Sequence, residues 1–78
     1  MNLERNTVLT DEDGKNFFVY NIVDYKEKQY AVCVEYDYPK KYAVFEYKYD
    51  DDELLIRKED NQKDIQLILA YSLKKRNN

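Results

Sequence analysis

Two short acidic segments hold the side chains best suited to binding a cation. "DEDG" at 11–14 resembles the start of an EF-hand loop, which requires Gly at its sixth position and Glu at its twelfth. Counted from Asp11, those positions hold Asn16 and Ile22, so the pattern fails. Asp-Gly is instead typical of a hairpin turn. "DDDE" at 50–53 has no scaffold to order its carboxylates, and we interpret it as a solvated acidic loop.

Side chains for catalysis are scarce. The sequence has no His, which removes the commonest general base and transition-metal ligand. Cys33 lies in the apolar run "AVCVE", where a thiol behaves as a small hydrophobe. Glu35 and Glu46 form a possible carboxylate pair, but no third polar partner is evident. A single glycine excludes phosphate-binding loops. We therefore predict no enzyme activity and no catalytic, metal or cofactor-binding residues.

Length and charge narrow the class of protein. Seventy-eight residues predict one small domain spanning 1–78. The net charge of −3 disfavours direct nucleic-acid binding, because phosphates are repelled. A single cysteine forms no internal disulfide, so we expect a reducing, cytoplasmic setting. The longest apolar run, 67–71, is too short to span a membrane.

The elements that would position any site are mostly strands. Runs rich in β-branched and aromatic residues predict strands at 7–10, 16–25, 29–36, 42–49 and, more weakly, 54–57. The connections are short, and the only proline falls in a loop at 37–41. Short connections favour pairing between consecutive strands, so we predict an antiparallel meander of four to five strands.

A helix is predicted at the C-terminal end, over residues 61–75. Ile65, Ile68, Leu69 and Ser72 recur at three- and four-residue steps, which is helical spacing. Asp60 or Asn61 is a candidate N-cap, and the run at 74–76 places cations at the C-terminal end of the helix dipole. The predicted fold is α+β, with one helix packed on one face of the sheet.

The order of these elements resembles a known family. "LTDEDGK" followed by "FFVYNIVDYKEKQYAV" is similar to the opening of the YrzB-like family of small acidic bacterial proteins of unknown function. The matching positions are Phe17, Val19, Ile22, Val23, Tyr25, Lys28, Tyr30, Ala31 and Val32. Phe45 and the helix from about residue 61 also fit the family pattern. The resemblance implies the same fold and brings no catalytic residues.

Tyrosines on the third and fourth strands suggest a contact surface. With residue 34 near residue 44, alternation divides the two strands into two faces. Small residues at Ala31, Cys33 and Ala43, beside Phe45 and Tyr47, leave room for a helix, so we expect the helix there. The opposite face would lie open as an interaction surface. Its members are Tyr30, Val32, Val34, Tyr36, Tyr42 and Val44.

We predict a non-enzymatic cytoplasmic module that acts in protein interaction or regulation. Its partner would be another protein or a second copy of itself. The alternative is an acidic nucleic-acid mimic, such as a phage-encoded inhibitor of a nuclease or defence system, in which carboxylates imitate phosphates. The acidic residues that would serve in that role are Asp11, Asp13, Asp50, Asp51, Asp52 and Glu53.

Overall fold

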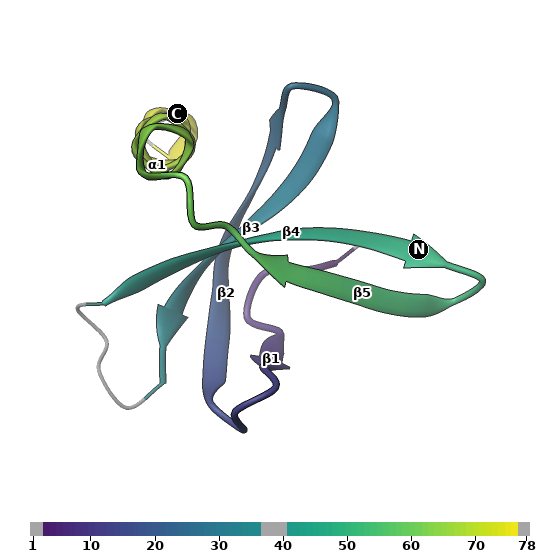
Figure 1. Ribbon diagram of the computed structural model, residues 1–78. Coiled ribbons are helices and arrows are strands. Elements are labelled where there is room, and N and C mark those ends of the chain that lie inside the picture. The colour runs from purple at the N-terminus through teal and green to yellow at the C-terminus, as the bar shows by residue number, and fades with distance from the viewer. Residues whose placement is uncertain (1–2, 37–40, 77–78) are drawn as a thin grey trace.

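The computed structural model describes residues 3–36 and 41–76, with no side-chain description for the last two (Figure 1). The strands are β1 (Val8–Thr10), β2 (Asn16–Tyr25), β3 (Lys28–Glu35), β4 (Tyr42–Asp50) and β5 (Glu53–Lys58). One helix follows, α1 (Gln62–Arg76). The loop predicted at 37–41 lies, apart from Lys41, outside the described residues.

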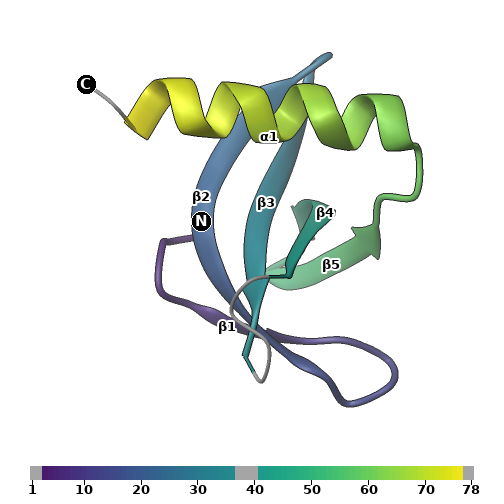
Figure 2. The ribbon, with the colours of Figure 1, turned by 90° about the vertical axis from the view of Figure 1, so that its left-hand side faces the viewer.

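The strands form one antiparallel sheet in the order β1-β2-β3-β4-β5, as the sequence predicts. The sheet twists and curls strongly, so that β4 and β5 run nearly across the direction of β2 and β3 (Figure 1). The helix lies across β2 and β3 on one side of the sheet (Figure 2). The fold is therefore α+β, a five-stranded meander followed by one helix.

Two hairpins use two-residue turns. Tyr25 pairs with Lys28, and the turn residues Lys26 and Glu27 have φ of 51° and 63°. The acidic segment at 50–53 has the same form, with positive φ at both of its central residues. Positive φ at both central positions is the type I′ geometry that matches the twist of paired strands. "DDDE" is thus a tight hairpin turn.

The β1–β2 turn is built around a carboxylate. Oδ1 of Asp11 accepts hydrogen bonds from the backbone N–H of Asp13 at 3.0 Å and of Lys15 at 2.9 Å. Gly14 has a φ of 81°, a left-handed conformation that glycine adopts without strain. The predicted Asp-Gly hairpin turn is confirmed. The Asp11 carboxylate orders the backbone of this turn.

A β-bulge interrupts β2. The pairing with β3 passes from Val19↔Cys33 directly to Asn21↔Val32, so Tyr20 is an extra residue. Tyr20 and Asn21 consequently share the helix side of the sheet, and the alternation of the strand reverses after them. A bulge also increases local twist, which contributes to the curl of the sheet.

The sheet separates two hydrophobic clusters. Inside the curl lie the buried side chains of Leu3, Leu9, Phe17, Val19, Ala31, Cys33, Ala43, Phe45 and Tyr47. Beneath the helix lie the buried side chains of Val23, Tyr30, Val32, Val44 and Ile68. The predicted division of β3 and β4 into two faces therefore holds.

The predicted side for the helix was wrong. Ile68 packs with Tyr30, Val32 and Val44, not with Cys33 and its neighbours. Small side chains on the other face make room for the sheet to curl over itself, so β1 and β5 cover that face. The predicted strand register was also wrong by two residues, because Val34 lies opposite Tyr42. A two-residue shift keeps every side chain on its face.

The helix begins at an ordered cap. Oδ1 of Asn61 accepts a hydrogen bond from the N–H of Asp64 at 3.1 Å, which identifies Asn61 as the N-cap. Glu59 is buried just before it, and its Oε2 accepts from the N–H groups of Asp60 and Asn61, each at 3.2 Å. The segment entering the helix is thus fixed by two side chains. In the described residues, no helix is long and apolar enough to cross a membrane.

Candidate protein-interaction surface

A row of apolar side chains crosses four strands at one level of the sheet. Val8 on β1 lies opposite Phe18 on β2, Phe18 lies opposite Val34 on β3, and Val34 lies opposite Tyr42 on β4. Directly opposed residues point to the same face, so the four side chains are contiguous. Phe18 is 40% exposed and Tyr42 is 52% exposed. The row is therefore an open apolar strip.

Two tyrosines extend the row. The ring of Tyr36, which is 53% exposed, stacks on Phe18 with centroids 5.1 Å apart and planes 12° apart. The bulge residue Tyr20 meets Tyr42 edge to face at 6.1 Å. We call these six residues the aromatic face: Val8, Phe18, Tyr20, Val34, Tyr36 and Tyr42. They lie on the helix side of the sheet, beyond the part that the helix covers.

The aromatic face continues to the last turns of α1. A small hollow of about 90 Å³ lies there, between the sheet residues Tyr20, Val32 and Tyr42 and the helix residues Leu69 and Leu73. None of the six residues of the aromatic face is charged, although 37% of the chain is. Uncharged apolar side chains gathered in one place are typical of a protein contact surface.

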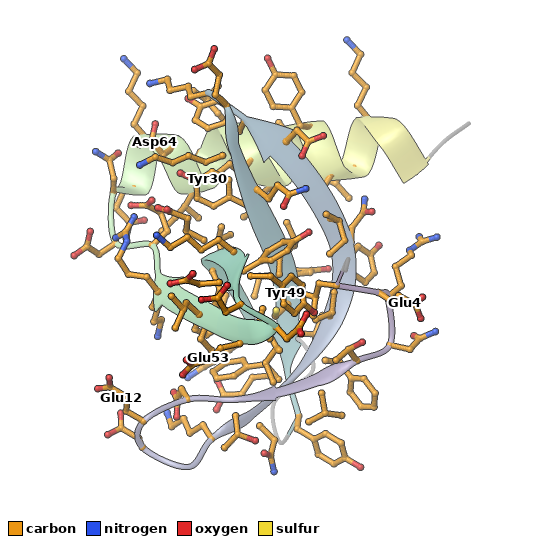
Figure 3. All side chains as sticks on the ribbon, turned by 90° about the vertical axis from the view of Figure 1, so that its right-hand side faces the viewer. Glu4, Glu12, Tyr30, Tyr49, Glu53 and Asp64 are labelled. Carbon is orange, nitrogen blue, oxygen red and sulfur yellow. The ribbon has the colours of Figure 1, made fainter. Side chains whose placement is uncertain are left out.

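The sequence-predicted surface divides into two parts. Tyr30, Val32 and Val44 are buried, and Figure 3 shows Tyr30 beneath the N-terminal half of the helix. These three belong to the core, so their assignment to an open surface was wrong. The helix covers them because the opposite face is closed by the curl. Val34, Tyr36 and Tyr42 lie beyond the helix and belong to the aromatic face.

Three residues of the aromatic face were missed. Val8, Phe18 and Tyr20 belong to β1 and β2, whereas the surface predicted from the sequence comprised only residues of and beside the third and fourth strands. The Asp-Gly turn was the available signal, because pairing across it places Val8 near Phe18. Tyr20 lies two residues beyond Phe18 on β2, so the ordinary alternation of a strand already places it on the same face as Phe18.

The predicted acidic residues occupy two separate turns. Asp11 and Asp13 are in the β1–β2 turn, at the bottom of Figure 1, whereas 50–53 form the β4–β5 turn at its right-hand tip. Figure 3 labels Glu12 and Glu53, which mark the two turns. The structure thus presents the six carboxylates as two patches rather than as one line. Asp11 already accepts two backbone hydrogen bonds.

A charged network spans β3, β4 and β5. Arg57 donates to Oε1 of Glu46 at 2.8 Å and to Oε1 of Glu59 at 3.2 Å, and Lys28 lies 3.6 Å from Glu46. The hydrogen bond from Arg57, aided by the charge of Lys28, lowers the pKa of Glu46. Burial and the nearby Glu59 and Glu46 carboxylates raise the pKa of Tyr30, which keeps its phenol protonated. Each charged side chain of this network therefore has an oppositely charged partner within the network.

The groups considered for catalysis are not brought together. Glu46 lies opposite Tyr30, five residues along β3 from Glu35, so the backbone positions of the two residues are about 16 Å apart along the strand direction. They also point to opposite faces. Cys33 is fully buried, and burial raises the pKa of its thiol to about 12, so it stays a thiol at neutral pH.

The larger hollows carry charged groups but neither His nor Cys. One of about 470 Å³ lies between the β1–β2 turn and β5, with Phe45 beneath it. Another of about 570 Å³ lies beside the buried Glu59, whose oxygens are already bonded to Arg57 and to the backbone before α1. Among the described residues, no three His, Cys, Asp or Glu side chains gather closely enough to hold a metal ion.

No family model matches the chain, and the searches of curated proteins and of solved structures found no match either. The resemblance to the YrzB-like family therefore stays a prediction.

Proposed function

We propose that this protein is a non-enzymatic module of the cytoplasm that binds another protein through the aromatic face. The observation that carries this proposal is the row Val8–Phe18–Val34–Tyr42, which leaves an apolar strip open across four strands. Tyrosine suits a contact surface because its ring is buried on binding while its hydroxyl can stay hydrated.

The chemistry of the aromatic face also indicates the kind of partner. A surface without charged side chains gains most from apolar and aromatic groups, and Tyr is enriched among the residues that dominate binding energy. Binding of this kind depends little on salt, because screening acts on charges. An acidic mimic would behave in the opposite way, losing its basic partner as the salt concentration rises.

Affinity capture from a lysate of the source cells, at low and high salt, tests the proposal. The wild-type protein should retain a partner at high salt, and Tyr36→Lys with Tyr42→Lys should lose it. Both tyrosines are about half exposed, so circular dichroism and the unfolding midpoint of the double variant should stay close to wild type. Leu55→Lys, at an exposed position on β5, is the matched control and should bind normally.

Two results would contradict the proposal. A partner that is released by salt and is retained by the double variant would favour the acidic turns and the nucleic-acid mimic. A double variant that unfolds would show that the aromatic face is part of the core.

A further inference from the structure

β5 forms one edge of the sheet, because the strand order ends with it and it pairs only with β4 among the described strands. Proteins usually keep an edge strand from pairing with other chains by means of a proline, a bulge or charged side chains. β5 contains no proline, and its pairing with β4 is unbroken. Its charged residues lie towards its two ends, whereas residues 54–56 are uncharged. The middle of this edge is thus open to an added strand.

Three residues of β5 point their backbone groups away from β4. The N–H of Glu59, just beyond β5, donates to the carbonyl oxygen of Val44 at 2.8 Å, so the odd-numbered residues of β5 are the ones bonded to β4. In an antiparallel pair, every second residue turns its N–H and C=O to the opposite side. Leu54, Ile56 and Lys58 therefore present their backbone groups at the open edge, where a further strand can bond.

A hollow of about 470 Å³ lies alongside the C-terminal half of this edge. The β1–β2 turn at 11–13 forms one side of the hollow, and Ile56 and Lys58 belong to the other. Its floor is the ring of Phe45, which is buried among the side chains inside the curl. Figure 3 shows Glu12 on the turn, with β5 above it. A strand added to β5 would turn alternate side chains toward this apolar floor.

The rim of the hollow is negatively charged. The turn brings three carboxylates to it at 11–13. In the described part of the chain, neither Glu12 nor Asp13 forms an ion pair. Arg57 also lines the hollow, but two carboxylates already accept its hydrogen bonds. Among the described residues of the rim, Lys58 is then the one cation without an acidic partner. The excess of carboxylates is complementary to a cationic ligand.

We propose that the open edge of β5 binds an extended, basic segment of a partner protein, which adds to the sheet as a sixth strand. The backbone of this segment pairs with that of Ile56 and Lys58, an apolar side chain covers Phe45, and lysine or arginine side chains face the turn at 11–13. Backbone hydrogen bonds give such a complex its affinity, and pockets for alternate side chains give it selectivity. The aromatic face lies on the helix side of the sheet, so this site is separate from it.

A short synthetic peptide of alternating lysine and valine provides the probe. When it binds, NMR should show slower hydrogen exchange at the amides of Ile56 and Lys58, because they gain hydrogen bonds, and little change at Leu55 and Arg57, which β4 already protects. A peptide of alternating glutamate and valine should bind at least about tenfold more weakly, because the acidic turn repels it. No binding of the lysine peptide up to about 1 mM, or no added protection at Ile56 and Lys58, would overturn the proposal.

Two pairs of variants separate backbone pairing from charge. Lys58→Pro removes an outward N–H but keeps the bonds to β4, so it should weaken peptide binding, whereas Lys58→Ala keeps that N–H and should not. Glu12→Lys with Asp13→Lys should weaken binding at least about tenfold. Glu4→Lys with Glu27→Lys, an equal charge change at exposed positions outside the hollow, is the matched control and should have a much smaller effect. Equal effects within either pair would contradict the proposed site.

Two further measurements distinguish this site from other modes of binding. Tyr36→Ser with Tyr42→Ser alters the aromatic face without adding charge, and this variant should bind the peptide as wild type does. Loss of peptide binding in that variant would place the peptide on the aromatic face. Protection of the Ile56 and Lys58 amides that rises with protein concentration, without any peptide, would identify a second copy of the chain as the occupant and would overturn the proposal.

Discussion

Asn21 and Ser72 are 51 residues apart in the chain, yet Nδ2 of Asn21 donates to both the carbonyl oxygen and Oγ of Ser72, at 3.1 and 3.0 Å. Asn21 is the residue that the β-bulge turns toward the helix, and Ser72 is buried. The bulge therefore provides the polar contact that joins the sheet to α1. Oδ1 of Asn21 also accepts a hydrogen bond from the N–H of Ile22 at 2.9 Å, so both the nitrogen and the oxygen of the side-chain amide are hydrogen-bonded.

Replacing this amide tests its role in docking the helix. Asn21→Ala should lower the free energy of unfolding by about 1–3 kcal/mol, because it leaves a buried hydroxyl without its donor. Urea denaturation followed by far-UV circular dichroism gives this value. Asn16→Ala, on the same strand but exposed, is the control and should change stability by less than about 0.5 kcal/mol. Equal effects of the two substitutions would refute a special role for Asn21.

Changing each of three adjacent helix residues to Ala should lower the free energy of unfolding by very different amounts. Ile68 is fully buried, so Ile68→Ala should cost about 2–5 kcal/mol in unfolding free energy. Leu69 is only partly buried, so its truncation should cost less. Leu67→Ala, at an exposed position, should cost less than about 0.5 kcal/mol when measured on dilute protein. Equal destabilisation by the three substitutions would contradict the observed orientation of the helix.

The Glu46–Arg57 contact predicts a pH dependence of stability. The pKa of Glu46 is lowered in the folded state, so its contribution is present above the ordinary value of 4.5 and is lost as pH falls through the folded pKa. Glu46→Gln should thus be less stable than wild type at pH 7, with the difference shrinking below about pH 4.5. Because the Arg57 side chain is 56% exposed, the effect at pH 7 should stay below about 1 kcal/mol.

A double-mutant cycle provides the control for that prediction. In an Arg57→Met background, Glu46→Gln should leave the pH profile of stability nearly unchanged, because the main cause of the pKa shift is already gone. An undiminished effect of Glu46→Gln in that background would assign the pH dependence to another contact.

A glycine at position 27, in the β2–β3 turn, should make the folded protein more stable. Glu27 has a φ of 63°, which costs energy for a residue with a Cβ, so Glu27→Gly should raise stability by about 0.5–1 kcal/mol. Glu12→Gly is the matched control in the β1–β2 turn. Glu12 is not among the residues with positive φ, so this change should destabilise. Thermal unfolding of the two variants gives the comparison, and equal shifts would argue against strain at Glu27.

The sequence predicts the elements well because their signals are local. Turn residues at 11–14 and 50–53 and the change from strand to helical spacing after residue 61 fix the boundaries, and the observed ones differ from those predicted by no more than one residue. The order of the strands follows from their short connections. Asn61, one of two candidate caps, is the one observed.

The choice of face depends on long-range geometry that no short segment encodes. Ala31, Cys33 and Ala43 leave space whether a helix or the curled sheet fills it, so their size alone does not decide between the two. The curl depends partly on the bulge at Tyr20 and Asn21, and the register of β3 against β4 depends on the loop between them. Tyr30, Val32 and Val44 lie beneath the helix, which explains why only half of the predicted surface residues belong to the aromatic face.

The same connectivity sets the route by which the chain folds. Every strand pairs with its neighbour in sequence, so the sheet forms from short loops whose closure costs little entropy. The helix does not share this advantage, because it docks on β2 and β3 rather than on β5, the strand just before it. We expect a fast step in which the hairpins form, followed by a slower step that closes one large loop between Asn21 and Ser72. Changes beneath the helix would then act mainly on the rate of unfolding, because those contacts form last.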